Sequence, residues 1–384
     1  MRKHESELVF EETADIAGAR IKLRTNSKHV IDWWRLNWYL TDGDPEGIVH
    51  VIIGVENHEP HLYYNLKNRK SLIVNSEYYG AVKSAGALGL AGVILEGRGG
   101  YPIHGACIGV EKNGETEGVV IIAPTGTGKT TQSHELTYSL PNSKVHSDDY
   151  MFVFFRGKKP VSIATERQLY MRTDIVEEHP TFGHLFNDLP LENVVIEKER
   201  CAQISDKKES MGPCYRKVFE NEKECILDEG SDRCYWSYGN SRVMFPRHMF
   251  PMQKRDENGY LHEYPKGKEN VVDEVVIKYV FLLTRDDSSP PARKLECDEA
   301  IDVLKLGKYV IRPGAGPPDK WGKTGFEPFY NPYPPELNLK SQESFFRKLF
   351  SCGVLFYLLN TGSYQGREIT PHRTHTYIRR IIEA

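Results

Sequence analysis

The sequence predicts an α/β fold. Runs of β-forming apolar residues alternate with segments of helical spacing, and these runs are Val119–Ile122, Met151–Phe155, Val275–Leu283 and Val354–Leu359. A glycine-rich loop at Ala123–Thr131 follows the first run and opens a helix. Strands that alternate with helices around such a loop indicate a layered α/β core in this part of the chain.

The N-terminal part of the chain predicts a smaller α/β domain over residues 1–95. The segment Trp33–Tyr79 alternates apolar and polar residues in places and contains short apolar runs at Ile48–Ile53 and Ser71–Val74, as strands do. Tyr79–Leu95 is rich in Ala, Gly and Leu, which suits a closely packed helix followed by a strand. Residues 96–384 would form the larger domain, which ends in a short helix at Thr376–Glu383.

The composition and charge limit the classes of protein to which the chain can belong. The chain has 384 residues, a net charge of −3, 39% hydrophobic and 27% charged residues, which is typical of a soluble globular protein. This charge argues against a nucleic-acid protein held by phosphate neutralisation. No apolar run reaches the ~18 residues that a membrane-spanning helix needs, and Met1–Glu7 lacks an apolar signal core. We therefore expect a cytoplasmic protein without a nucleic-acid or membrane partner.

The chain has seven cysteines, and an odd number in an intracellular protein indicates reduced thiols. Four of them lie in a polar insertion at about 197–240, and these are Cys201, Cys214, Cys225 and Cys234. No pair has the close C-x-x-C spacing of a typical zinc site, so scattered buried thiols are favoured over a metal there.

The segment Pro313–Pro335 is rich in Pro and Gly and also contains several aromatic residues. Such a composition resists regular structure, whereas the aromatic side chains favour packing. A lid or substrate loop and a structural crossover are equally compatible with it.

The loop Ala123–Thr131 has the residues of a phosphate-binding loop. Gly126 and Gly128 allow backbone N–H groups to turn inward around phosphate oxygens, and the helix that follows adds a favourable dipole. Lys129 would reach the β- and γ-phosphates, and Thr130 would ligate Mg²⁺. Ala123 replaces the first glycine of the pattern G-x-x-x-x-G-K-[ST], but the strand–helix context still predicts nucleotide binding. The predicted nucleotide-binding residues are Thr125, Gly126, Thr127, Gly128, Lys129, Thr130 and Thr131.

Two adjacent carboxylates, Asp148 and Asp149, follow a short apolar run about 20 residues after this loop. A metal-binding acid of the Walker B type ends a strand at such a place. Because neighbouring residues on a strand point in opposite directions, one carboxylate would face a metal directly. The other would face the metal's water shell or a neighbouring strand.

A series of motifs resembles those of ATP-dependent phosphoenolpyruvate carboxykinases. The matching segments are E-Y-Y-G-A-V-K-S at 77–84, H-G-A at 104–106, the loop at 123–131, S-D-D-Y at 147–150, L-E-N-V at 191–194, S-R-V at 241–243, L-L-N-T-G at 358–362 and I-T at 369–370 with Thr374 soon after. They keep the family's order over about four-fifths of the chain, and HPr kinases share the His, P-loop and Asp-Asp core. The resemblance implies a carboxykinase-like P-loop mixed sheet with flanking helices in 96–384, and a smaller N-terminal domain that contributes Tyr78 and Lys83.

The resemblance also implies a role for each matching residue. Lys129 would bind phosphates, and Arg242 would contact the transferring phosphoryl group. Thr130 would hold Mg²⁺, while His104 and Asp149 would bind a second cation such as Mn²⁺. The other implied roles are the metal's water shell for Asp148, the acceptor site for Tyr78 and the adenine pocket for Thr374.

The departures from the family concern the acceptor side. Two successive lysines are replaced by Lys83-Ser84, so Lys83 is the remaining candidate catalytic lysine of this motif. Ala123-Pro124-Thr125 replaces G-L-S, whose serine contributes to the family's substrate site. An N-terminal R-S-P-K-D element is not clearly present, and the chain is shorter than a typical member. The nucleotide-handling half is thus retained and the dicarboxylate-handling half altered.

Three functions follow from this pattern. The favoured one is a kinase that transfers the γ-phosphate of ATP to a small-molecule or protein hydroxyl. Lys129, Arg242 and Mg²⁺ would spread the charge, and Asp149 or Asp148 would accept the hydroxyl proton. The first alternative is an ATP-dependent carboxykinase that converts oxaloacetate and ATP to phosphoenolpyruvate, CO₂ and ADP. The second is a non-catalytic nucleotide-binding module. The expected partners are ATP and a phosphate acceptor that the sequence does not identify.

Overall fold

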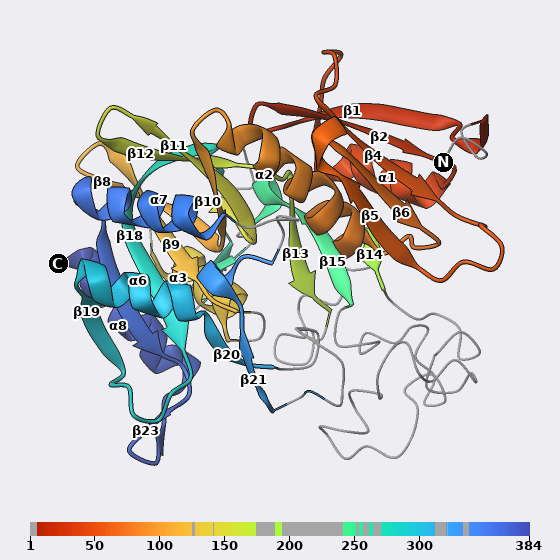
Figure 1. Ribbon diagram of the computed structural model, residues 1–384. Helices are drawn as coiled ribbons and strands as arrows, with labels where there is room; N and C mark the ends of the chain where they lie inside the picture. The colour runs from red at the N-terminus through yellow and green to blue at the C-terminus, as the bar shows by residue number, and fades with distance from the viewer. Residues whose placement is uncertain are drawn as a thin grey trace.

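The computed structural model describes residues 6–124, 127–140, 142–173, 189–193, 241–250, 253–255, 261–263, 270–311, 320, 322–332 and 338–384. Within this part of the chain the protein is a mixed α/β structure with two large sheets (Figure 1). Both sheets contain parallel and antiparallel strand pairs. The predicted insertion at 197–240 with its four cysteines lies outside the described residues, as do Thr125 and Gly126.

The first sheet has six strands in the order β3-β1-β2-β4-β6-β5. Their bounds are β1 Phe10–Ile16, β2 Ala19–Thr25, β3 Tyr39–Leu40, β4 Gly47–Ile52, β5 His61–Asn65 and β6 Lys70–Val74. The apolar runs predicted at Ile48–Ile53 and Ser71–Val74 are β4 and β6, which pair in parallel.

The prediction of strand-like structure from Trp33 onward was wrong at its start, because helix α1 spans Lys28–Asn37. The Ser27 side chain caps this helix by accepting a hydrogen bond from the backbone N–H of Val30. Trp33 and Trp34 are buried on the helix, and their rings meet edge to face. The cap and this buried face outweigh the strand preference of the aromatic residues.

A second correction concerns Tyr79–Leu95, which holds no strand. A π-helix at Ala81–Leu88, labelled η3 here, continues directly into α2 at Gly89–Glu96. The small residues allow this helical segment to approach the first sheet closely, since a Cβ on Gly86 would lie 3.3 Å from the Val49 side chain and 3.4 Å from that of Ile73. π-helical turns are rare and occur mostly at functional sites.

The second sheet has nine strands, with a main path β10-β8-β9-β18-β12-β11-β7 and with β22 and β19 added beside β18. The bounds are β7 Gly100–His104, β8 Ala106–Lys112, β9 Glu115–Ile122, β10 Ser143–Ser147, β11 Tyr150–Arg156, β12 Lys159–Ala164, β18 Glu274–Thr284, β19 Ala292–Leu295 and β22 Leu355–Asn360. All four predicted β runs lie in this sheet, as β9, β11, β18 and β22. The long strand β18 pairs in parallel with β9 on one side and with β22 on the other.

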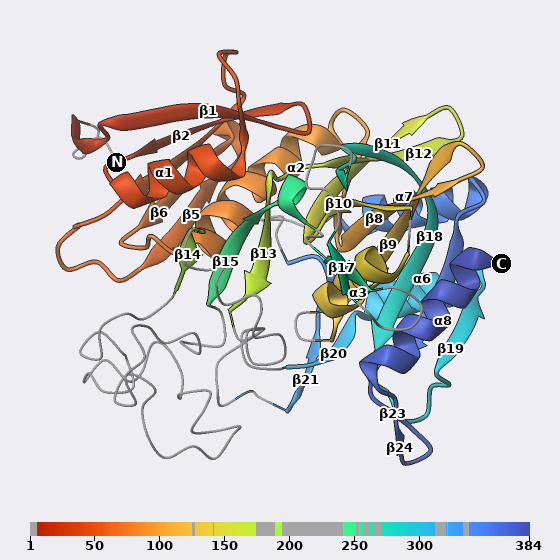
Figure 2. The ribbon, with the colours of Figure 1, turned by 180° about the vertical axis from the view of Figure 1, so that it is seen from behind.

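Helices cover both faces of the second sheet. They are α3 Lys129–Ser139, α6 Cys297–Leu306, α7 Leu339–Ser351 and α8 Pro371–Glu383. Val120 and Ile122 of β9 share a core with α6 and α7, whereas Val119 and Ile121 share the opposite core with α3 and α8. Figure 1 shows α6 and α7 in front of the sheet, and Figure 2 shows α3 and α8 from behind. The terminal helix begins earlier than predicted because Thr370 caps it and Pro371 occupies its first turn.

A small sheet lies between these parts, in the order β13-β15-β14. Its strands are β13 Gln168–Arg172, β14 Leu191–Glu192 and β15 Arg242–Pro246. The other described elements are η2 Leu66–Asn68, η7 Arg247–Met249, β16 Gln253–Arg255, β17 Leu261–Glu263, β20 Lys308–Val310, β21 Thr324–Phe326, η10 Pro328–Tyr330, β23 Ser363–Tyr364 and β24 Arg367–Glu368. The segment predicted as a lid or crossover, Pro313–Pro335, is described only at 320 and 322–332, which include β21 and η10.

The first core crosses the predicted boundary at residue 95. It joins the first sheet and its helices to Tyr150 and Phe152 of β11, Tyr170 of β13 and Met244 of β15.

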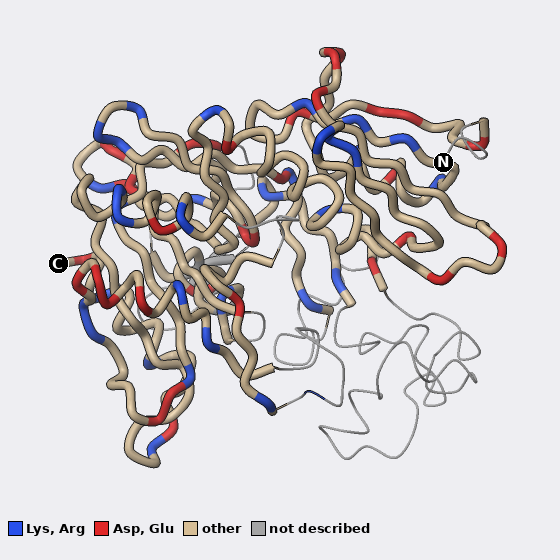
Figure 3. Tube along the Cα trace, in the orientation of Figure 1, with Lys and Arg blue, Asp and Glu red and all other residues tan. Residues whose placement is uncertain are grey.

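No helix in the described ranges is long and apolar enough to cross a membrane. In the view of Figure 3, Lys and Arg are interspersed with Asp and Glu along the described trace.

Candidate functional site

The predicted phosphate-binding loop lies between β9 and α3, in the strand–helix context that the sequence predicts. Gly128 adopts a φ of +100°, a left-handed conformation that glycine tolerates best, and Lys129 begins the helix. The Thr127 hydroxyl donates to the carbonyl O of Pro124 at 2.6 Å. The backbone carbonyl O of Thr127 accepts a hydrogen bond from the Thr361 hydroxyl at 3.1 Å. The positive end of the α3 dipole therefore faces the loop, where it favours a bound anion.

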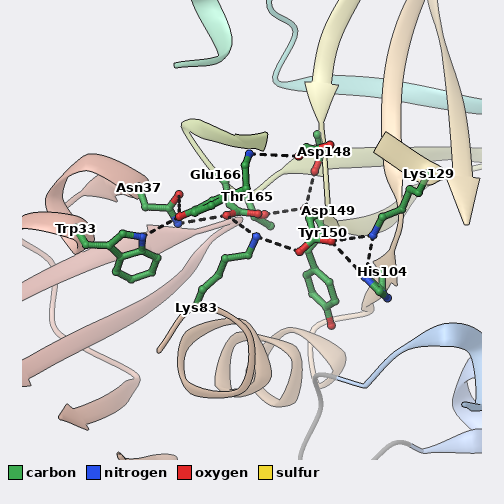
Figure 4. A network of polar contacts seen from close by, with 12 residues as sticks. Trp33, Asn37, Lys83, His104, Lys129, Asp148, Asp149, Tyr150, Thr165 and Glu166 are labelled. Carbon is green, nitrogen blue, oxygen red and sulfur yellow. Dashed lines mark hydrogen bonds and ion pairs between the residues drawn. The ribbon is translucent and has the colours of Figure 1, made fainter. Parts of the chain in front are cut away.

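Four predicted site residues meet in one charged cluster (Figure 4). The Lys129 Nζ lies 2.8 Å from Asp149 Oδ1 and 2.8 Å from His104 Nε2. His104 Nε2 lies 3.2 Å from the same Asp149 oxygen. The Lys83 Nζ approaches from the other side, 3.0 Å from Asp149 Oδ2. We call Lys83, His104, Lys129 and Asp149 the charged cluster.

The strand topology explains why His104 meets Asp149. The chain passes from β7 into β8 at Gly105 and from β10 into β11 at Asp148-Asp149. These two passages lie side by side, since the Gly105 N–H donates to the carbonyl O of Asp149 at 2.9 Å. A Cβ on Gly105 would lie 2.9 Å from the carbonyl O of Ile121, so the close approach requires glycine.

The hydrogen bonds of His104 fix its tautomer. Its Nδ1 lies 2.6 Å from the carbonyl O of Tyr330, which can only accept, so Nδ1 carries a proton and donates it. Nε2 then presents a lone pair to the Lys129 ammonium. The neutral ring is held by a backbone carbonyl behind it, which is the usual arrangement for a metal-binding histidine.

Lys83 is deeply buried, with a side chain 4% exposed, and a second carboxylate holds it. Glu166 Oε1 lies 3.1 Å from the Lys83 Nζ, and the Tyr170 ring centroid lies 4.3 Å away. Burial acts to lower the pKa of Lys83, but the charges of Asp149 and Glu166 outweigh burial and raise it. The amine is therefore an ammonium under physiological conditions.

The two carboxylates beside Lys83 respond oppositely. Burial acts to raise the pKa of Asp149, yet Lys129 and Lys83 outweigh it and hold this pKa well below its ordinary value. Burial raises the pKa of Glu166 to about 7 despite the charge of Lys83. Asp149 is thus firmly ionised, while Glu166 ionises near neutral pH.

Asp148 faces away from the charged cluster. Its Oδ2 accepts a hydrogen bond from the backbone N–H of Tyr170 at 3.3 Å, and its Oδ1 lies 3.7 Å from His134 Nε2. Burial lowers the pKa of His134 and keeps this ring neutral. Both side chains line a cavity of about 10 Å³ between α3 and β13. The two adjacent carboxylates therefore diverge, and Asp148 ties the turn to a neighbouring strand.

The remaining predicted residues lie outside the cluster. Arg242 stands opposite Arg172 in the small sheet and donates to the carbonyl O of Ser241 at 3.1 Å. Among the described residues, no contact joins Arg242 to the charged cluster. The charge of Arg242 acts to lower the pKa of Tyr79, whereas burial raises this pKa. The Tyr78 side chain is exposed, with its ring 5.2 Å from that of Tyr79.

The other nucleotide candidates lie in helices. Thr130 and Thr131 are in the first turn of α3. Thr374 is buried in α8, where its hydroxyl donates to the carbonyl O of Thr370 at 3.5 Å. The described contacts therefore keep Thr374 within its own helix.

Two donor atoms of the cluster suit a divalent cation. His104 Nε2 and Asp149 Oδ1 lie 3.2 Å apart and converge on one point, which the Lys129 ammonium takes. An imidazole nitrogen with a carboxylate oxygen is an acceptable donor pair for Mn²⁺. Among the described residues, no group of three or more His, Cys, Asp or Glu side chains could hold a metal ion. The pair therefore fits a cation that takes its other ligands from water or phosphate.

Sequence reasoning missed Glu166 and Tyr170, which contact Lys83, and Asn37 and Trp33, which contact these two residues. Glu166 follows the apolar strand β12, in the same manner that Asp148 and Asp149 follow β10. An acid directly after a buried strand was therefore an available signal. Nothing in the local pattern around Asn37 or Trp33 predicts their contacts with Glu166 and Tyr170, which lie more than 100 residues away along the chain.

No protein-family model matches the chain, and no curated protein sequence matches it.

Proposed function

We propose that the protein is an ATP- and divalent-metal-dependent phosphotransferase of the phosphoenolpyruvate carboxykinase-like group, acting as a kinase on a hydroxyl acceptor. The observation that carries this proposal is the convergence of Lys129, His104 and Lys83 on Asp149. These residues come from four motifs of the resemblance, and they meet beside the N-terminus of α3. A carboxykinase-like P-loop fold accounts for this meeting.

The cluster can carry out the work that phosphoryl transfer needs. That reaction depends on positioning and on neutralising the charge of the transferring group. Lys129 would exchange Asp149 and His104 for phosphate oxygens, and the N-terminus of α3 would hold the remaining anionic charge. Arg242 of the small sheet, whose positive charge acts on Tyr79, would contact the transferring group. A divalent cation held by His104 and Asp149 would supply further charge neutralisation.

Of the two proton acceptors that the sequence suggested, Asp149 and Asp148, we propose Asp149. The Asp148 carboxylate is occupied by the Tyr170 N–H and faces away from Lys129, so we assign it to holding β13. Asp149 is the carboxylate that faces the cluster, but its low pKa makes it a weak base. A loose transition state for phosphoryl transfer needs little help from a base, so this weakness is compatible with a kinase.

The test is the turnover of ATP by purified protein with Mg²⁺ and Mn²⁺, followed by ³¹P NMR. We expect release of ADP, with water as a slow acceptor when no other is supplied. Lys129→Met should abolish this release, whereas Lys144→Met should not, since Lys144 forms a surface ion pair with Glu111 on β8. ATP binding without any ADP formation would favour a non-catalytic module and refute the kinase.

The carboxykinase alternative is supported by Arg242 and Tyr78 and opposed by Ser84 in place of the second lysine. Adding oxaloacetate to the same assay separates the two activities. Formation of phosphoenolpyruvate and CO₂ would replace the kinase by a carboxykinase. Lack of both, with ADP still formed, would retain the kinase.

A further inference from the structure

A chain of buried hydrogen bonds connects helix α1, which packs on the first sheet, to Lys83. The Trp33 Nε1–H donates to the Tyr170 hydroxyl at 2.9 Å, and that hydroxyl donates to Asn37 Oδ1 at 3.0 Å. The Asn37 amide nitrogen donates to Glu166 Oε1 at 3.3 Å, and the same oxygen lies 3.1 Å from the Lys83 Nζ. All five side chains are buried. Figure 4 labels four of these residues, Trp33, Asn37, Glu166 and Lys83.

The direction of every bond in this chain follows from its first member. An indole N–H can only donate, so the Tyr170 oxygen accepts and must pass its single proton to Asn37. Asn37 therefore presents its carbonyl to Tyr170 and its NH₂ to Glu166. Glu166 Oε1 is left as an acceptor, which is the state that receives the Lys83 ammonium.

Lys83 is also confined on its other sides. Asp149 Oδ2 accepts from it at 3.0 Å, and the Tyr170 ring lies beneath its ammonium at 4.3 Å from the centroid. The Tyr170 ring in turn stacks on Tyr79 with centroids 4.9 Å apart. Two carboxylates and one aromatic face therefore set the position of this ammonium.

We propose that Glu166 is a positioning residue that holds the Lys83 ammonium against Asp149, and that the chain from Trp33 through Tyr170 and Asn37 orients it. The first sheet is then a working part of the site. Lys83 and Glu166 come from opposite sides of the residue 95 boundary, so their ion pair fixes the two parts of the site relative to each other. The activity readout of this inference rests on the proposed function, whereas the chemical readout below does not.

The chemical test measures how fast the Lys83 amine reacts. Full-length protein is acetylated at pH 8 with limiting acetic anhydride, and mass spectrometry compares Lys83 with the exposed Lys159 in the same sample. In the wild type we expect Lys83 to react at least about tenfold more slowly than Lys159 because it is buried and ion-paired. Glu166→Gln keeps the volume and the acceptor oxygen but removes the charge, and should speed the labelling of Lys83 several-fold.

The activity test separates a positioning role from a merely structural one. Glu166→Gln should lower kcat about 10-fold to 100-fold and leave the KM for ATP nearly unchanged, since Lys129 and α3 would bind the nucleotide. Glu274→Gln is the matched control, because its ion pair with Arg156 is exposed. If Glu166→Gln does not fold, Tyr170→Phe breaks the hydrogen-bond chain without removing a charge and should speed Lys83 labelling about twofold to threefold.

Unchanged Lys83 labelling in a folded Glu166→Gln or Tyr170→Phe protein would overturn the inference. So would an unchanged kcat in Glu166→Gln when the wild type turns over ATP. If the wild type shows no turnover, the proposed function fails alone, and the labelling result still decides the role of Glu166.

Discussion

Lys83 and Lys129 contact the same carboxylate from two different regions of the molecule. Lys83 comes from the π-helix that packs on the first sheet, and it is held by Asp149 Oδ2, Glu166 and the Tyr170 ring. Lys129 comes from the start of α3 on the second sheet, and it is held by Asp149 Oδ1 and the neutral His104.

The difference lies in what each ammonium would leave behind if it moved. If Lys83 moved, the buried Glu166 would lose its ion-pair partner, which is costly, whereas the partly buried Asp149 would keep Lys129. If Lys129 moved, it would lose its contacts with Asp149 Oδ1 and with the His104 ring. Asp149 would keep Lys83 through its other oxygen, and the neutral imidazole does not require a positive charge beside it. A bound phosphate can therefore compete for Lys129 but not for Lys83. We infer that Lys83, in the π-helix on the first sheet, is a fixed positive charge and that Lys129, at the start of α3, is a mobile one.

The largest effect is expected from Lys129→Met. Without this ammonium the transferring phosphoryl group loses a charge-assisted contact, so kcat should fall by about 10³-fold or more. The free energy of unfolding should fall by less than in Lys83→Met, because Asp149 retains Lys83. ATP turnover and urea unfolding measure the two quantities. A large loss of stability with normal turnover would reverse the roles of the two lysines.

Lys83→Met should show the opposite balance. Removing this ammonium leaves Glu166 buried without its ion-pair partner and Asp149 with Lys129 as its remaining lysine, which should destabilise the fold by about 3–5 kcal/mol at pH 8. The loss should shrink when Glu166→Gln is added, because one of the two carboxylates is then neutral. Urea unfolding of the single and double variants gives the coupling between the residues. Additive losses would show that Lys83 and Glu166 do not interact.

The pH dependence of stability should identify Glu166. Its folded pKa of about 7 lies above the ordinary value of 4.5, so it contributes stability that is fully present below pH 4.5 and lost as the pH rises through 7. From pH 5 to pH 8, the wild type should therefore lose about 2–3 kcal/mol relative to Glu166→Gln. Asp149 acts in the opposite sense at lower pH, and both proteins share that contribution. Parallel stability curves would contradict the raised pKa of Glu166.

The part of the site that follows from local sequence was predictable. The strand before the loop, Lys129 at the start of a helix and the carboxylates after β10 each leave a short-range pattern, because strand ends and helix starts place side chains predictably. The second sheet was predictable for the same reason, since its central strands are continuous apolar runs.

The surroundings of Lys83 were not predictable in this way. Asn37 and Glu166 meet across 129 residues of chain, and the contact exists because the first sheet packs against β11 and β13. A single sequence carries no local signal for such a contact. Helix α1 offers a contrast, because its cap at Ser27 is a local contact, yet strand-like structure was predicted from Trp33 onward.

The smallest effect concerns how Lys129 competes with a cation. Its ammonium takes the point on which His104 Nε2 and Asp149 Oδ1 converge, so a divalent ion can enter only when Lys129 moves. Lys129→Met should therefore bind Mn²⁺ about tenfold more tightly than the wild type in the absence of nucleotide, which corresponds to about 1.4 kcal/mol. Free Mn²⁺ measured by electron paramagnetic resonance gives the affinity without any need for turnover.

The control for this measurement is His104→Asn in the Lys129→Met background, which removes one donor atom and should reverse the gain. His61→Asn, on the exposed strand β5, should leave it unchanged. A cation brought in with ATP should then bind more tightly to the wild type than free Mn²⁺ does, because the phosphates draw Lys129 away from Asp149. Weaker Mn²⁺ binding by Lys129→Met would show that the lysine supports the cation site instead of occupying it, and the mobile charge would then lie elsewhere.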